Sequence, residues 1–557
     1  MKRLPIGISD YKEIVEEGYS YVDKTLLIEE IIQCGAKVIL IPRPRRFGKT
    51  MNLSMLKYFF EKTKEDYSPL FQRFNIWKTL FRERQGEFPL IFLTLKGIKK
   101  GNWSEAYRGI QSLIASEFER HSYLMDSNSL SKNEKKDFQN IMDKIPNDQN
   151  LFENSLKQLT YYLKKHHDKR VVVLIDEYDT PVLDSYLSGY YDPMILFMRN
   201  WFTEGLKDNS CLEKAVLTGV LRVSKESVFS GLNNPGCYTV LDEAFADKFG
   251  LLEEEVAGLL EEYGISLPIE EIRKWYNGYR IGQNSLYNPW SILQCIEKKG
   301  ELRPYWVNTS DNELIKKLVI QGSPLLKKDL EKLLLGETIA KPINEGTVFK
   351  NLTGQTDSVW GLFLFTGYLT LVEKPVYKEG VLQCKLKIPN QEIHDLYKAM
   401  IVEWMTRNLP SDDLVTLLDS LTTGDVETFS KIFQVFIVNC VSFYDTAQDE
   451  PEKVYHAFVL GLLITLTQTH EVKSNRESGF GRYDVCLIPK DPSSLGVVIE
   501  FKKVDEKEDL EKGAEDALKQ IEEKKYAAEL KSRGIKKILS LGMAFKGKCV
   551  FIKERLL

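Results

Sequence analysis

Short, largely apolar runs separated by helical patterns organise the first 240 residues of the chain. Runs of this kind are typical of strands that are covered on both faces of a sheet. They occur at residues 38–41, 88–95, 171–175 and 215–221. Strands that alternate with helices predict an α/β sheet with right-handed crossovers, and we place the end of this domain near residue 240.

Residues 241–345 show mainly helical patterns, such as the amphipathic stretch at residues 252–260. Aromatic residues gather in turn-forming sequences at residues 275–279, 287–290 and 305–312. They favour a helical lid whose aromatic anchors pack on the sheet domain, and an aromatic ligand site is the alternative.

Residues 346–435 are interpreted as a connecting region that carries no recognisable chemistry. A half-exposed strand pattern at residues 382–389 is a candidate hairpin partner for residues 369–373. Near the start of the chain, Asp10 and Asp23 each precede a helical pattern, where N-cap residues are expected.

Residues 436–557 predict a second α/β domain with the order helix, strand, strand, helix and two short strands. The first helix is apolar on nearly all faces and is therefore expected to be buried. The six elements are expected at residues 454–467, 481–488, 495–503, 510–530, 537–540 and 549–552.

Gly48, Lys49 and Thr50 stand between the strand at residues 38–41 and a helical pattern. Backbone N–H groups and the helix dipole at such a turn can cradle a phosphate. Lys49 would neutralise phosphate oxygens and the Thr50 hydroxyl would hold Mg²⁺. The pattern is imperfect because Arg43 occupies the place of the first glycine, so an ordinary capped helix is the alternative.

Two carboxylates, Asp176 and Glu177, end the strand at residues 171–175. The carboxyl ends of strands deliver ligand groups in open α/β sheets. Asp176 would complete the Mg²⁺ shell and Glu177 would polarise the attacking water, while a solvated acidic turn is the alternative.

A further strand, at residues 215–221, carries Thr218 and leads to Arg222. Thr218 is a candidate sensor of the γ-phosphate. Arg222 is a candidate phosphate ligand because a planar guanidinium matches phosphate oxygens, and an ordinary surface base is the alternative.

The C-terminal domain places Asp484 fifteen residues before a Glu500-x-Lys502 sequence. Glu500 and Lys502 are two apart in a strand, so both side chains face the same side of the sheet. The two carboxylates can bind Mg²⁺ through hard oxygen ligands, and Lys502 can orient water or neutralise phosphate. A cross-strand salt bridge is the alternative.

Two further residues are weaker candidates for this second site. Glu477 and His456 could assist a metal, and ordinary surface and core roles are the alternatives.

Four segments, at residues 21–25, 43–50, 174–179 and 217–220, resemble the AAA-ATPase-like proteins of bacteria and archaea. That family has Arg-Pro-Arg-Arg-Phe-Gly-Lys-Ser/Thr where other phosphate loops have the first glycine, and it often carries a C-terminal PD-(D/E)XK nuclease-like domain. The resemblance implies that ATP is bound by the loop, Asp176, Thr218 and Arg222. The loop residues concerned are Arg45, Arg46, Phe47, Gly48, Lys49 and Thr50. The family pattern also implies that a glutamine such as Gln520 lies near the nuclease-like site, and a solvated helix face is an equally good alternative.

The charge, the apolar segments and the cysteines of the chain limit the classes of function that the sequence allows. Among 557 residues, 43% are hydrophobic and the net charge is −4, so a nucleic-acid surface must be local. An apolar signal region and a membrane-spanning run of about 18 residues are both missing from the sequence, which predicts a cytoplasmic protein without a membrane partner. The eight cysteines include no Cys-x-x-Cys pair, which argues against a zinc ribbon or disulfide framework.

The sequence thus predicts a P-loop ATPase domain (residues 1–240), a helical lid (241–345), a connecting region (346–435) and a PD-(D/E)XK nuclease-like domain (436–557). We expect ATP and Mg²⁺ to close the lid and control the access of DNA to Asp484, Glu500 and Lys502. Two alternatives are a signalling or defence switch that binds nucleic acid without cutting, and an interaction protein with vestigial sites. Formation of homo-oligomers is left open.

Overall fold

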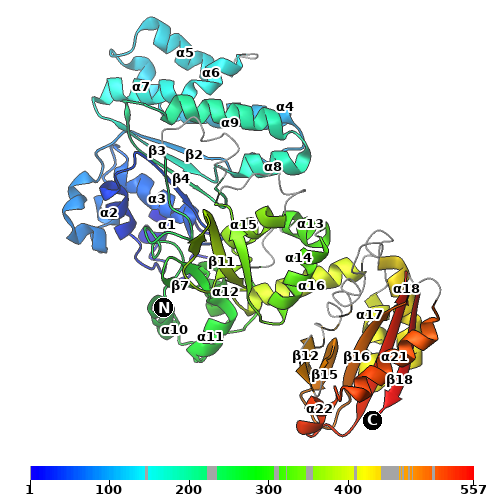
Figure 1. Cartoon of the computed structure of the whole chain (residues 1–557). Coiled ribbons are helices and arrows are strands. Elements are labelled where there is room, and N and C mark those ends of the chain that lie inside the picture. The colour runs from blue at the N-terminus through cyan, green and yellow to red at the C-terminus, as the bar shows by residue number, and fades with distance from the viewer. Residues whose placement is uncertain are drawn as a thin grey trace. The chain divides into compact units, whose positions relative to one another are not determined.

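The computed structural model in Figure 1 consists of two compact units, Met1–Ser310 with Ala340–Glu392 and Asp311–Ile339 with Ile393–Leu557. The structure describes residues 2–144, 148–222, 235–306, 313–321, 323–345, 356–406, 411–440, 459, 463, 466, 469–474, 477–478, 481–504, 508–547 and 549–557.

A five-stranded parallel sheet forms the centre of the first unit. In spatial order its strands are β2 (Leu90–Thr94), β3 (Val171–Asp176), β4 (Leu212–Gly219), β1 (Val38–Pro42) and β5 (Gly236–Cys237). The four predicted strands are confirmed, and β5 is an addition. Because β4 lies between β1 and β3, the carboxyl ends of these three strands meet at one edge of the sheet.

Helices cover both faces of this sheet, which explains why β3 is buried along its whole length. Figure 1 shows α1 to α3 on one side and α4, α7 and α9 on the other. The helices are α1 (Tyr11–Glu16), α2 (Leu26–Gln33), α3 (Lys49–Phe60), α4 (Trp103–Arg120), α5 (Lys132–Met142), α6 (Gln149–Glu153), α7 (Ser155–His167), α8 (Thr180–Ser188) and α9 (Tyr191–Leu206). The described residues of this region also form the 3₁₀ turns η1 (Ser68–Leu70), η2 (Asn75–Lys78), η3 (Leu80–Arg84) and η4 (Ser122–Asp126).

The structure confirms one of the two predicted helix N-caps and contradicts the other. Asp10 caps α1 by accepting a hydrogen bond from the Glu13 N–H at 3.1 Å, as predicted. The expectation for Asp23 was wrong, because α2 begins two residues later and Thr25 occupies its N-cap position. The Asp23 carboxylate instead accepts from the Thr25 N–H at 2.9 Å and from the Asn75 N–H at 2.8 Å, which ties this segment to η2.

A helical group follows the parallel sheet within the first unit. It contains α10 (Glu253–Glu262), α11 (Ile269–Tyr276), α12 (Pro289–Glu297) and the hairpin of β6 (Tyr279–Ile281) and β7 (Asn284–Leu286). Tyr276 and Tyr287 are fully buried in the apolar core of this group. Both tyrosines are therefore packing anchors, as the sequence favoured.

The first unit also contains a small sheet. Its strands are β8 (Ile339–Ile343), β9 (Thr370–Leu371), β10 (Val376–Lys378) and β11 (Val381–Lys387), with α15 (Thr356–Thr366) before β9. Leu386 pairs with Leu371 in antiparallel register, which confirms the expected pairing of these two segments.

A mixed five-stranded sheet forms the core of the second unit. Its order is β12 (His470–Ser474), β15 (Val485–Pro489), β16 (Gly496–Lys503), β17 (Ile538–Lys546) and β18 (Cys549–Leu556). The pair β16 and β17 is parallel and the other pairs are antiparallel. The last two strands are longer than predicted. Charged residues of β18 such as Arg555 obscure its pattern, because they pair with glutamates of α21.

Two apolar clusters lie on opposite faces of this sheet. One involves α17 (Ser411–Thr423) and α18 (Val426–Cys440), and the other involves α21 (Leu510–Glu523) and α22 (Ala528–Ser532). The remaining elements are α13 (Glu313–Gln321), α14 (Pro324–Leu334), α16 (Gln391–Thr406), β13 (Glu477–Ser478) and β14 (Gly481–Arg482). The helix expected at residues 454–467 falls largely outside the described residues.

Candidate functional site

The turn that precedes α3 has an unusual backbone. Arg46 and Gly48 have φ angles of 66° and 79°, in the left-handed region that glycine adopts most easily. Gly48 is the N-cap of α3, and no side chain caps this helix end. The first N–H groups of the helix therefore receive no hydrogen bond from an N-cap side chain, as expected where backbone N–H groups cradle a phosphate.

Lys49 folds back over the loop that precedes it. Its Nζ donates to the carbonyl oxygens of Arg43 at 3.1 Å and Pro44 at 3.0 Å. Burial lowers the pKa of this ammonium, and the nearby Glu177 charge acts in the opposite direction. A desolvated ammonium held on two neutral carbonyls is well suited to exchange them for an anion.

Arg43, which replaces the first glycine of the usual phosphate loop, is fully buried. Its guanidinium donates to the carbonyl oxygens of Pro42 at 2.9 Å, Tyr238 at 2.7 Å and Phe245 at 3.1 Å. Burial lowers its pKa to about 10. Arg43 therefore braces the backbone behind the loop.

Asp176 joins two of the predicted site residues. The Thr50 hydroxyl donates to one carboxylate oxygen and the Thr218 hydroxyl to the other, each at 2.8 Å. Asp176 has no exposed surface, and burial raises its pKa. The strand order accounts for this geometry. β4, which carries Thr218 one residue before its end, lies between β3, which ends at Asp176, and β1, which leads to the loop before Thr50.

Glu177 follows at a φ of 50°, a strained conformation for a residue with a side chain. Its carboxylate accepts a hydrogen bond from the Thr180 hydroxyl at 3.2 Å. Asp179 was missed as a structural residue: it accepts from the N–H groups of Val220 at 2.9 Å and Leu221 at 2.8 Å. These bonds connect the end of β3 to the chain that leaves β4.

The other loop residues contact the helical group. Arg46 stacks over the Trp290 ring at 4.4 Å, and Phe47 is buried edge-on against Tyr279 with ring centroids 5.0 Å apart. The Arg45 carbonyl accepts from Trp306 Nε1 at 3.3 Å. These long-range contacts leave no local signal in the sequence, so they could not be predicted.

Arg222 lies at the end of the described segment after β4 and pairs with Glu345, with Nη1 and Oε2 2.7 Å apart. A phosphate role for Arg222 requires this ion pair to open.

Glu392 connects the helical group to the start of α16. Its buried carboxylate accepts from the Trp306 N–H at 2.6 Å and from the Ser291 hydroxyl at 2.9 Å. Burial raises its pKa to about 7, above the ordinary value of 4.5. Trp306 is thus held between Glu392 and the Arg45 carbonyl.

This raised pKa predicts that stability falls as the pH rises. Between pH 4.5 and 7 the folded chain holds a proton on Glu392 that the unfolded chain loses, so unfolding becomes easier through this window. The effect is about 3 kcal/mol at most. We expect Glu392→Gln to remove it, as measured by urea unfolding from pH 5 to 8, with exposed Glu271→Gln as the control. Equal pH slopes for wild type and Glu392→Gln would contradict the assignment.

In the second unit, Asp484 lies opposite Glu500 on adjacent strands, one position beyond the pair of Val485 and Ile499. The Asp484 carboxylate accepts from the Phe501 N–H at 2.8 Å, and the Glu500 carboxylate accepts from the Asp484 N–H at 3.3 Å. The two acids are therefore held side by side, with Glu500 only 4% exposed.

Lys502 and Gln520 complete this arrangement from two elements. Val498, two residues before Glu500, packs with α21 in one apolar cluster, so strand alternation places Glu500 and Lys502 on this face as well. From α21, the Gln520 amide donates to Glu500 and to the Tyr526 hydroxyl. In the described part of the chain Lys502 makes no ion pair with Asp484 or Glu500, so the salt-bridge alternative is not supported.

Within the residues that the structure describes, no group of three or more His, Cys, Asp or Glu side chains is placed to hold a metal ion. Two adjacent carboxylates still suit Mg²⁺, which commonly binds one or two carboxylates together with water and substrate phosphate. His456 and the side chain of Glu477 lie outside the described residues.

The fold and the two sites define a protein that joins a P-loop-like α/β domain to an α/β domain with paired acids. Residues 5–229 match the family described as predicted AAA-ATPase, and residues 450–555 match the PD-(D/E)XK nuclease superfamily. The chain therefore carries an AAA-ATPase-like domain and a PD-(D/E)XK superfamily domain, which confirms the resemblance.

A relative in Azotobacter chroococcum mcd 1, described as an uncharacterized protein in the vnfD 5′ region, is similar along its whole length. It is 26% identical over 558 residues, and the match covers 98% of this chain and 96% of the relative.

In the described parts of the chain, no helix is both long enough and apolar enough to span a bilayer.

Proposed function

We propose that this chain hydrolyses ATP and that its nucleotide site controls a metal-dependent DNA nuclease site. The observation that carries the first half is the bond of Asp176 to both Thr50 and Thr218 beside an uncapped helix end. Hydroxyl and carboxylate oxygens at a helix N-terminus suit an Mg²⁺–triphosphate complex.

In the nucleotide site, Lys49 would exchange its two loop carbonyls for phosphate oxygens. Thr50 and Asp176 would hold Mg²⁺, and Glu177 would orient the attacking water. Thr218 is placed to respond to the bound triphosphate because it shares the Asp176 carboxylate. The site thus has the chemical groups that ATP hydrolysis requires.

In the nuclease site, Asp484 and Glu500 would hold Mg²⁺, with Lys502 beside the scissile phosphate. The metal would supply charge neutralisation and an activated water. Gln520 holds the Glu500 carboxylate in place, and the Phe501 N–H does the same for Asp484. These bonds fix the positions of the two carboxylates that would hold the metal.

Coupling between the sites is supported by a chain of contacts in the first unit. Arg46 and the Arg45 carbonyl contact Trp290 and Trp306, and Trp306 binds Glu392 at the start of α16. That helix continues into the second unit. We propose that movement of the helical group on nucleotide binding is transmitted along this route and controls access of DNA to the nuclease site.

A switch that binds nucleic acid without cutting is the second candidate. It is favoured by the absence of a third metal-binding side chain among the described residues.

The test is cleavage of supercoiled plasmid and single-stranded DNA by the full chain, in Mg²⁺ or Mn²⁺, with and without ATP. We expect metal-dependent cutting whose rate depends on ATP. DNA binding without cutting would favour the switch. If the chain binds neither ATP nor DNA, the result would favour an interaction protein with vestigial sites.

A further inference from the structure

The segment at residues 21–25 carries part of the family resemblance, yet neither proposed site uses it. Its backbone is fixed to η2, because the side chains of Asp23 and Thr25 accept hydrogen bonds from N–H groups of that turn at 2.8 Å and 3.2 Å. Lys24 lies between these two anchors and is only 7% exposed. A buried ammonium on a fixed backbone calls for a specific partner.

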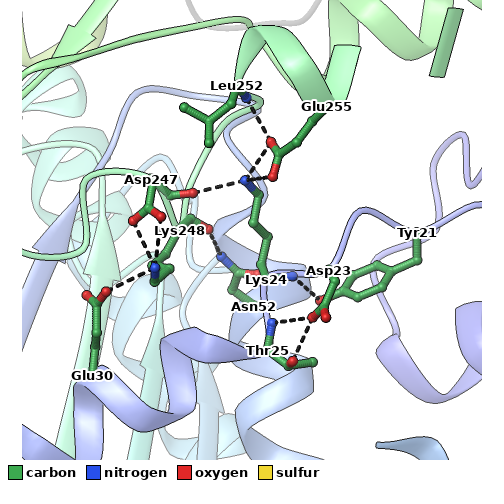
Figure 2. Close-up of polar contacts among 10 residues, drawn as sticks. All are labelled: Tyr21, Asp23, Lys24, Thr25, Glu30, Asn52, Asp247, Lys248, Leu252 and Glu255. Atoms are coloured by element: carbon green, nitrogen blue, oxygen red, sulfur yellow. Dashed lines mark hydrogen bonds and ion pairs between the residues drawn. The ribbon is translucent and has the colours of Figure 1, made fainter. Parts of the chain in front are cut away.

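The partner of Lys24 is the start of α10, as Figure 2 shows. Lys24 Nζ contacts the two Glu255 carboxylate oxygens at 2.6 Å and 2.7 Å and donates to the Asp247 carbonyl at 2.9 Å. The Glu255 carboxylate also accepts from the Leu252 N–H at 2.7 Å, which closes the first turn of α10. One ammonium group therefore holds both ends of the segment at residues 247–255.

Two helices of the sheet domain hold the same segment. Lys248 Nζ lies 3.0 Å from Glu30 of α2 and 2.9 Å from the Asp247 carboxylate. The Asn52 amide of α3 donates to the Lys248 carbonyl at 2.9 Å (Figure 2). The ammonium groups of Lys24 and Lys248 thus both have anionic partners inside the protein, and they join the segment to the sheet domain.

The 247–255 segment contacts the candidate phosphate loop at Gly250. The Gly250 N–H donates to the carbonyl of Phe47, the residue before Gly48, at 3.3 Å. Gly250 has a φ of 86°, and a Cβ at this position would lie 3.0 Å from the Phe47 ring. Because the two chain segments are in such close contact, a displacement of residues 247–255 would displace Phe47 as well.

We propose that Lys24 is a positioning residue of the nucleotide site, which holds residues 247–255 against Phe47 and so fixes the backbone at Gly48. The inference rests on the proposed ATP site at the start of α3. A loop that already has its binding conformation gives higher affinity, because no binding free energy is used to order it. Lys24 acts through the backbone of the loop, while its own charge stays on Glu255.

The test uses Lys24→Met combined with Glu255→Gln in the full chain. Replacing both partners avoids a buried charge without its counterion, and the glutamine oxygen can still accept the Leu252 N–H. Without ATP, we expect hydrogen exchange at Gly250 and at residues 47–52 to be about tenfold faster than in wild type, while β3 keeps its wild-type rates. ATP should bind about tenfold more weakly, because binding must then order the loop.

Lys157→Met combined with Glu204→Gln is the matched control. It makes the same chemical change at an exposed ion pair between α7 and α9, in which Nζ and Oε2 are 2.8 Å apart. The control should keep the wild-type exchange rates of residues 47–52 and the wild-type affinity for ATP. In the Lys24 variant, unchanged exchange at these residues or unchanged ATP affinity would overturn the inference. Equally faster exchange in β3 would also overturn it, since the effect would then be a general loss of stability.

Gly250→Ala tests the same contact from its other side and decides the matter if the Lys24 variant does not fold. The added methyl group would crowd the Phe47 ring at a φ that favours glycine, so exchange at residues 47–52 should again rise and ATP affinity should fall. Wild-type ATP affinity in Gly250→Ala would overturn the proposed route. If wild type binds no ATP, the proposed function fails, and the exchange rates still show whether Lys24 holds the loop.

Discussion

Metal-dependent DNA cleavage should fall by about 1,000-fold in Asp484→Asn, because the substitution removes one of the two adjacent carboxylates that would hold the metal. The fold should survive, since an asparagine oxygen can still accept the Phe501 N–H that the aspartate accepts at 2.8 Å. The measurement is the initial rate of plasmid nicking in Mg²⁺, with thermal unfolding of the same preparation.

Two controls sharpen this prediction. Asp516→Asn changes an exposed acid on α21 and should cut like wild type. ATP hydrolysis by Asp484→Asn should be unchanged, because Asp484 lies in the second unit and the ATP site in the first. If Asp484→Asn retained wild-type cutting, the paired acids would have no part in the reaction, and any nuclease activity would come from elsewhere.

The longer buried strands of the two five-stranded sheets could be located from the sequence because they are short apolar runs. The two-residue strand β5 and the largely polar strand β12 could not. The position of β4 between β1 and β3 could not, since strand order depends on contacts between distant segments. That order brings Thr218 to Asp176, so the chemical types of the site were predictable while their hydrogen bonds were not.

Basic residues show the other limit of sequence reasoning. Arg43, Arg45 and Arg46 all stand in one loop, and their charge alone suggests phosphate binding. In the structure Arg43 is buried on backbone carbonyls and Arg46 stacks on Trp290. Arg222 pairs with Glu345, which is 123 positions away in the chain. Apart from the neighbouring Pro42 carbonyl, each partner comes from a segment that no local pattern connects to the loop.

Lys49→Met should bind ATP about 100-fold more weakly than wild type, because a charge-assisted contact to phosphate is worth about 3 kcal/mol. Methionine keeps most of the buried aliphatic stem and removes a charge whose pKa burial already lowers. Its thermal midpoint should therefore stay close to that of wild type. Titration with a fluorescent ATP analogue, together with the rate of phosphate release, measures the effect.

The same variant tests the coupling of the two sites. If nucleotide binding controls the nuclease, Lys49→Met should cut DNA at the rate that wild type shows without ATP, whether or not ATP is added. Lys64→Ala, an exposed lysine after α3, should respond to ATP like wild type. An unchanged ATP response in Lys49→Met would show that nucleotide acts at another place in the chain. Loss of cutting below the ATP-free rate would show that Lys49 is needed for the structure of the nuclease domain, a result that its position in the first unit does not predict.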